Sequence, residues 1–142
     1  MYKLIILLAA SALSACSTAP MQNAANTQFG PCPSAPRCVS SLEVGSKHIA
    51  ALTVNSVEQW QLLQETLLNM PRTNVVERQA NYLHAVTHSA IMRYRDDIEL
   101  RYQPNTNRAE VRSASYLGYY DFEVNRERVE TLRKLFNAAK NN

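Results

Sequence analysis

The sequence predicts a single α+β domain, with an antiparallel sheet of about four strands and two helices packed on one face of that sheet. Apolar residues recur at helical spacing in two stretches, and between them they alternate with polar residues as in strands. Because the order is helix, strands, helix, both helices are expected to cover the same face. Of the 142 residues 46% are hydrophobic and 19% charged, which excludes a disordered chain and suits one domain over 32–142.

Residues 1–15 are predicted to be a lipoprotein signal peptide. Lys3 precedes an apolar run that is too short to cross a bilayer, since a spanning helix needs about 20 apolar residues. The run ends in Leu13-Ser14-Ala15-Cys16, which resembles the bacterial lipobox. That resemblance implies that the Cys16 thiol receives a diacylglyceryl group, that the leader is cut before Cys16, and that the new amine is then acylated. The alternative is a plain signal peptide with Cys16 as a stray thiol.

Residues 16–31 are predicted to be a flexible tether, because they are rich in Ser, Thr, Ala, Asn and Gln and have no hydrophobic period. The lipid on Cys16 would hold the chain at a membrane, facing the periplasm. Ser17 follows the cysteine, which by resemblance to enterobacterial sorting favours the outer membrane. The formal net charge of +3 is too weak to indicate a nucleic acid partner.

Cys32 and Cys38 are predicted to form a structural disulfide. An exported chain meets an oxidising compartment, and two prolines bend the loop between these cysteines. Closing so short a loop would stabilise the fold by roughly 2 kcal/mol. A redox dithiol usually has two intervening residues instead of five, and a metal pair would need more ligands at close spacing, so these two interpretations remain as alternatives.

The first helix is expected to begin after Ser56, with Gln59 completing a capping box, and to end at Pro71. Its apolar face consists of Val57, Trp60, Leu63 and Leu67, with Trp60 as a core anchor. The preceding residues 42–54 hold short apolar stretches and are expected to wrap the surface of the domain.

The middle of the chain predicts strands. Residues 73–79 form a short one, whereas the periodicity of 81–94 fits either a helix or a strand. Asp96-Asp97 is expected to break the chain before a hairpin made of strands 98–103 and 109–115.

The final helix is expected to be capped by Asn125. Its apolar face is Val129, Leu132, Phe136 and Ala139.

Three stretches of the chain together resemble a known set of motifs in their order and spacing. They are Cys32-Pro33-Ser34-Ala35-Pro36-Arg37-Cys38-Val39-Ser40-Ser41, then Tyr82-Leu83-His84-Ala85, and finally Val111-Arg112-Ser113-Ala114-Ser115 with Asn125-Arg126 and Arg128 behind it. Together they resemble the bacterial domain-of-unknown-function family 1499, over about 32 to 135. The resemblance favours a strand over 81–94 and implies no activity. The chain departs from it at Tyr116, where Arg is common, and at Glu123, where Gly is common.

Six polar residues near the end of the chain are candidate ligand-binding residues: Arg112, Ser113, Ser115, Asp121, Asn125 and Arg126. Asn125 and the first amides of the final helix would favour an anion, with Arg126 placed to pair with a carboxylate or phosphate. The alternative is structural. Asp121 and Asn125 would then be turn and cap groups, and the arginines would pair with Asp96, Asp97 or Glu99.

We expect no cofactor and no metal. His84 and His88 have a metal-binding spacing only on a helix, and neither Ser113 nor Ser115 lies in a Gly-x-Ser-x-Gly motif. The sequence therefore predicts a lipid-anchored, non-catalytic binding module of the cell envelope. Its partner would be a protein, a cell-wall fragment or an anionic small molecule. An enzyme using the Ser, Asp and Arg residues of 112–126 is the alternative.

Overall fold

The computed structural model describes residues 29–141, so the predicted signal peptide and the lipidation site Cys16 lie outside the described residues. The elements are β1 (Cys38–Ser40), η1 (Gly45–Lys47), β2 (Leu52–Thr53), α1 (Val57–Leu68), β3 (Thr73–Gln79), β4 (Tyr82–His88), β5 (Arg95–Gln103), η2 (Pro104–Thr106), β6 (Arg108–Ser115) and α2 (Val124–Lys140).

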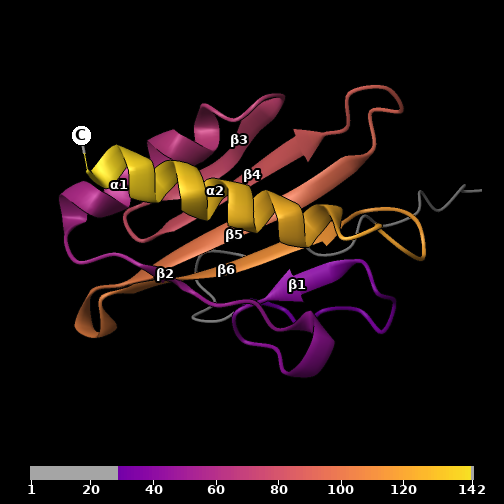
Figure 1. Ribbon diagram of the computed structural model, residues 1–142, viewed down its shortest axis with the longest axis horizontal. Coiled ribbons are helices and arrows are strands. Elements are labelled where there is room, and N and C mark those ends of the chain that lie inside the picture. Colours follow the sequence, from indigo (N-terminus) through magenta and orange to yellow (C-terminus); the bar gives the residue numbers. More distant parts are fainter. Residues whose placement is uncertain (1–28, 142) are drawn as a thin grey trace, which may run out of the picture.

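The strands form one antiparallel sheet in the order β1-β6-β5-β4-β3, and β2 pairs with β6 on the same edge as β1. Both helices lie on one face of this sheet (Figure 1). Leu83, Leu100 and Val111 stand in register on that face and are fully buried beneath the helices. The predicted antiparallel sheet with two helices on one face is therefore confirmed.

The strand number and the element order differ from the prediction, because six strands replace about four and two of them precede α1. β1 and β2 have three and two residues, too few to produce an alternating pattern. Residues 42–54 also do more than wrap the surface, since Ile49, Leu52 and Val54 enter the core.

β4 is a strand, as the family resemblance favoured, and it is buried on both faces. Leu83 and Ala85 pack under the helices, while Tyr82 and His84 are equally buried on the opposite face. A strand with two buried faces shows no simple alternation, so periodicity alone could not assign it.

The expected break at Asp96-Asp97 is wrong, because both residues lie inside β5. Asp97 accepts a hydrogen bond from His84 of the neighbouring strand, and Asp96 pairs with Arg128 of α2. These long-range partners satisfy the two carboxylates and override the local preference of aspartate for turns.

α1 begins as predicted. The hydroxyl of Ser56 accepts the backbone N–H of Gln59 at 3.2 Å, and the Gln59 side chain accepts that of Asn55 at 2.9 Å. Trp60 is confirmed as a core anchor, because it is 2% exposed and stacks on Tyr102 with ring centroids 5.6 Å apart. Val57, by contrast, is exposed.

The predicted cap of α2 is wrong. The helix starts at Val124, so Asn125 lies inside its first turn and is fully buried. Asp121 bonds the early backbone N–H groups instead, accepting from Glu123 at 3.2 Å and from Asn125 at 3.3 Å. The side chain that usually accepts these backbone N–H groups belongs to the N-cap residue itself. Here the acceptor is an aspartate two residues before the N-cap position.

β3 forms the outer edge of the sheet and is largely exposed. Its register with β4 shifts between Val75 and Glu77, which marks a β-bulge in the edge strand.

Candidate functional site

Four of the six predicted site residues meet in a buried polar group between the sheet and α2. The side-chain oxygen of Asn125 accepts from the Ser113 hydroxyl and from Arg128, each at 2.7 Å. Its side-chain nitrogen donates to the Ser115 hydroxyl at 2.9 Å and to the Asp121 carboxylate at 2.7 Å. We call Ser113, Ser115, Asp121, Asn125, Arg128 and Asp96 the Asn125 cluster.

Arg128 and Asp96 complete this cluster and were not among the predicted site residues. The Arg128 guanidinium bonds the Asp96 carboxylate, and also the Ser113 hydroxyl at 3.1 Å. Arg128 follows Asn125 by three residues, so the two share a helix face, and this spacing was the available sequence signal. The side chains of the cluster bond one another, the carbonyl oxygen of Arg37 and the backbone N–H of Glu123, which fits the structural alternative better than ligand binding.

The N-terminus of α2 already holds an anion, the carboxylate of Asp121. Arg126 lies away from it and donates to the carbonyl oxygens of Ser46 and His48, at 2.6 and 3.0 Å. Arg126 therefore fastens the η1 loop to α2, and the structure does not bring it together with Arg112.

Arg112 points to the other face of the sheet, as strand alternation requires. Its guanidinium contacts the Glu99 carboxylate at 3.1 Å, and the Tyr82 hydroxyl donates to the same carboxylate at 2.8 Å. Burial raises the pKa of Tyr82, and the charge of Glu99 and this hydrogen bond raise it further. Tyr82 therefore stays protonated and, with Arg112, holds a carboxylate that is only 3% exposed.

A second pair of polar side chains lies on the same face of the sheet as Arg112 and Glu99. His84 Nε2 and Asp97 Oδ1 are 2.9 Å apart, and Arg95 contacts the same oxygen at 3.2 Å. Burial would raise the pKa of Asp97, but the hydrogen bond and charge of His84, together with Arg95, outweigh burial and lower the pKa below its usual value. The face without helices thus carries two groups of paired charges, and strand alternation alone could not distinguish these from a solvated surface.

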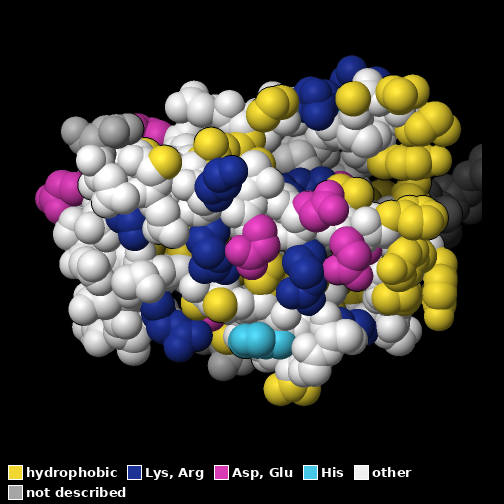
Figure 2. Space-filling view, viewed as in Figure 1, with side chains coloured by type: hydrophobic (Ala, Val, Ile, Leu, Met, Phe, Trp, Pro, Cys, Tyr) yellow, Lys and Arg dark blue, Asp and Glu magenta, His cyan; other side chains and the backbone are white. Residues whose placement is uncertain are grey.

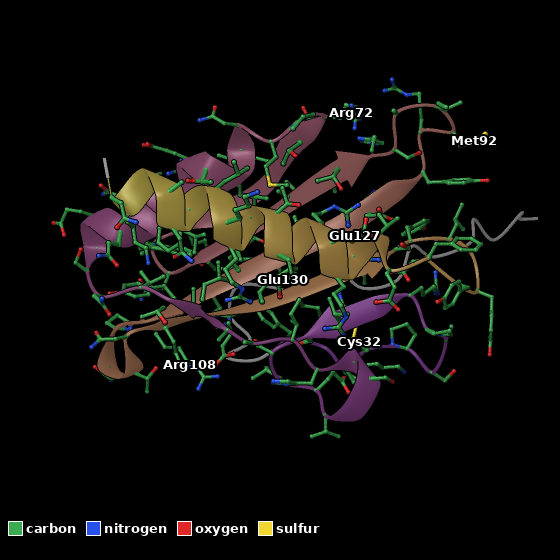
Figure 3. All side chains as sticks on the ribbon, in the orientation of Figure 1. Cys32, Arg72, Met92, Arg108, Glu127 and Glu130 are labelled. Atoms are coloured by element: carbon green, nitrogen blue, oxygen red, sulfur yellow. A yellow bond between two sulfur atoms is a disulfide. The ribbon has the colours of Figure 1, made fainter. Side chains whose placement is uncertain are left out.

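A cavity of about 490 Å³ opens over Arg112. We call it the Arg112 pocket, and it is lined by Pro31, Cys32, Pro33, Arg37, Arg112, Tyr116 and Leu117. Cys32 is joined to Cys38 by a disulfide, with their Cα atoms 5.6 Å apart. In Figure 3 Cys32 lies below the first turns of α2.

Arg37 supplies the second guanidinium of the pocket. It donates to the backbone oxygens of Ser115 and Tyr116 at 2.9 and 2.7 Å. The sequence could not link Arg37 to Arg112, because the two meet only through the long-range pairing of β1 with β6. The pocket therefore places two guanidiniums between apolar walls, with Arg112 also paired to Glu99, and guanidiniums in such a setting can bind an anionic group on a partly apolar molecule.

Within residues 29–141, Ser115 and His84 do not meet, because they lie on opposite faces of the sheet. Ser115 faces α2 and bonds Asn125, whereas His84 lies on the opposite face and bonds Asp97. In the same part of the chain no three His, Cys, Asp or Glu side chains gather as a metal site would require. No helix between residues 29 and 141 is long and apolar enough to cross a bilayer.

These features define a small α+β domain in which an open antiparallel sheet carries two helices on one face and a disulfide-closed N-terminal segment on its edge. Residues 28–136 match the family described as "Protein of unknown function (DUF1499)". The match covers most of the chain, so the chain belongs to this family. No curated protein and no solved structure matches it.

Proposed function

We propose that this chain is a lipid-anchored protein of the bacterial cell envelope, held at the outer membrane and facing the periplasm. Its folded head is a non-catalytic binding module, and the Arg112 pocket receives an anionic group of the partner. A cell-wall fragment, an acidic protein segment and an anionic small molecule each carry such a group.

The observation that carries the binding role is the meeting of Arg37 and Arg112 at one open cavity. Arg112 is held in place by a buried carboxylate and Arg37 by two backbone carbonyls. A guanidinium oriented in this way loses little conformational freedom when it pairs with an incoming carboxylate or phosphate. The serines of the Asn125 cluster support a non-catalytic role, because their hydroxyls are engaged by an amide.

The anchor is supported by the lipobox-like Leu13-Ser14-Ala15-Cys16 and by the polar stretch after it. The disulfide between Cys32 and Cys38 is in keeping with an oxidising compartment. A single acyl chain binds a membrane only marginally, so the several chains of a bacterial lipoprotein would give lasting attachment.

The binding role is tested by crosslinking capture of envelope components on the full-length protein and on Arg112→Lys. Lysine keeps a cation beside Glu99 but cannot pair with two oxygens at once, so capture should fall sharply. Arg126→Ala is the matched control, because it removes a cation that contacts the η1 loop outside the pocket. Undiminished capture by Arg112→Lys would reject the pocket. The anchor is tested separately by the intact mass of membrane-extracted protein, with Cys16→Ser as control, and an unacylated, water-soluble product would reject it.

A further inference from the structure

Large apolar side chains gather, exposed, at one end of the molecule. The β4–β5 loop contributes Ile91, Met92 and Tyr94, which are 89%, 65% and 54% exposed. The loop between β6 and α2 contributes Tyr116, Leu117, Tyr119, Tyr120 and Phe122, of which Tyr119 and Phe122 are 77% and 79% exposed. We call these residues the aromatic end, and Figure 2 shows hydrophobic side chains concentrated there while charged ones cover α2.

The two loops form one surface because the backbone holds them together. The backbone N–H of Tyr116 donates to the Arg95 carbonyl at 3.0 Å, and the Arg95 guanidinium lies 5.4 Å from the Tyr116 ring centre. Within the second loop, the rings of Tyr120 and Phe122 meet edge to face at 5.0 Å. Met92 stands at the outer tip of the β4–β5 loop, pointing away from the body (Figure 3). A contiguous apolar surface of this kind marks a contact site.

We infer that the aromatic end rests in the headgroup region of a phospholipid bilayer that contains anionic lipid. Tyrosines mixed with Leu, Ile, Met and Phe are typical of the membrane interface, where a ring can bury its apolar part and keep its hydroxyl in water. Arg93, exposed at the tip of the first loop, supplies a cation toward anionic headgroups. The Asp121 carboxylate in the second loop is directed to the backbone of α2.

The length of chain before the head favours a bilayer over other occupants. This argument rests on the anchor in the proposed function. Residues 16–28 span at most about 45 Å even when fully extended, so a head tethered at Cys16 cannot leave the neighbourhood of the membrane. Phe29, where the described chain begins, lies over Arg101 on the face without helices, with its ring centre 5.9 Å from the guanidinium. From there Pro31 and Pro33 lead to the Arg112 pocket, which shares Tyr116 and Leu117 with the aromatic end.

The test places tryptophan at the aromatic end of the full-length, acylated protein. Tyr119→Trp and Met92→Trp probe the two loops, and Val57→Trp is the matched control, since Val57 is also exposed but begins α1 at the opposite end (Figure 1). The native Trp60 is buried and gives a constant background. Each variant is reconstituted in vesicles of phosphatidylethanolamine and phosphatidylglycerol, with and without brominated phosphatidylcholine. We expect a blue-shifted emission and loss of intensity to brominated lipid for both loop variants, and neither change for Val57→Trp.

An emission from Tyr119→Trp that stays as water-like and as unquenched as that of Val57→Trp, in protein that is acylated and vesicle-bound, overturns the inference but leaves the anchor intact. Conversely, quenching of Tyr119→Trp in protein that mass analysis shows to be unacylated supports the inference and rejects the anchor. A blue shift that appears only when envelope protein is added, or only on raising the concentration of the chain, assigns the surface to a protein partner and also overturns the inference.

Discussion

The side chain of Asn125 is fully buried between β6 and α2, where its amide oxygen accepts hydrogen bonds from Ser113 and Arg128. The sequence singled it out with Ser113, Ser115 and Asp121, and the structure brings these four together. It does not cap the helix, although an asparagine near a helix start is usually a cap exposed at the surface. The distinguishing fact, that the amide bonds two hydroxyls of β6, depends on how α2 packs on the sheet, and no local pattern encodes that packing.

Glu123, at the N-cap position of α2, has a left-handed backbone conformation. Its φ is +65°, in the left-handed region that glycine adopts without steric cost. We predict that Glu123→Gly is more stable than Glu123→Ala by about 1 kcal/mol, because both lose the contact with Arg126 but only glycine lacks the clashing Cβ. Urea unfolding of the two variants measures this difference. Equal midpoints would show that the left-handed backbone costs nothing here.

At the level of elements, the hairpin of β5 and β6 and the helix α2 could be predicted because their patterns are regular. The apolar face of α2 includes Val129, Leu132 and Phe136, which are all buried. β1 and β2 could not be predicted, since they are strands only through pairing with β6. The site followed the same division. Five residues of the Asn125 cluster lie between 113 and 128, and only Asp96 comes from β5, whereas the Arg112 pocket joins residues about 80 positions apart.

The contact between β4 and β5 predicts a pH dependence of stability. The folded pKa of Asp97 lies below its usual value, so the unfolded chain binds this proton more readily. The stabilising contribution is present above the unfolded pKa of about 3.9 and is lost as pH falls through the folded value. The stability gap between the native protein and Asp97→Asn should therefore narrow below pH of about 4. Urea unfolding midpoints of the native protein and of Asp97→Asn, measured from pH 3 to pH 7, check this prediction.

Glu65→Gln serves as the control for that measurement, because it removes an exposed carboxylate of α1. The same pH dependence in both variants would mean that the pair of His84 and Asp97 contributes nothing specific.

For the whole molecule, the disulfide joins the N-terminal segment to β1. That segment includes Cys32 and Pro33, which form one wall of the Arg112 pocket. Replacing both Cys32 and Cys38 with serine should lower the free energy of unfolding by roughly 2 kcal/mol, since the open chain regains loop entropy. Urea unfolding compares the double variant with the oxidised native protein. Reduced native protein is the control and should behave like the variant. A double variant as stable as the oxidised protein would contradict the prediction.

The bulged edge strand β3 would have a consequence for a head that the proposed lipid anchor confines to a membrane surface. Proteins that diffuse in two dimensions collide often, and an open strand offers backbone groups on which a neighbouring copy could add its own strand. The bulge between Val75 and Glu77 disturbs the spacing of those groups, and the charges of Glu77 and Arg78 follow it directly. At the opposite side of the sheet, β1 and β2 cover the edge of β6. Both edges of the sheet therefore disfavour strand-by-strand addition of further copies of this chain.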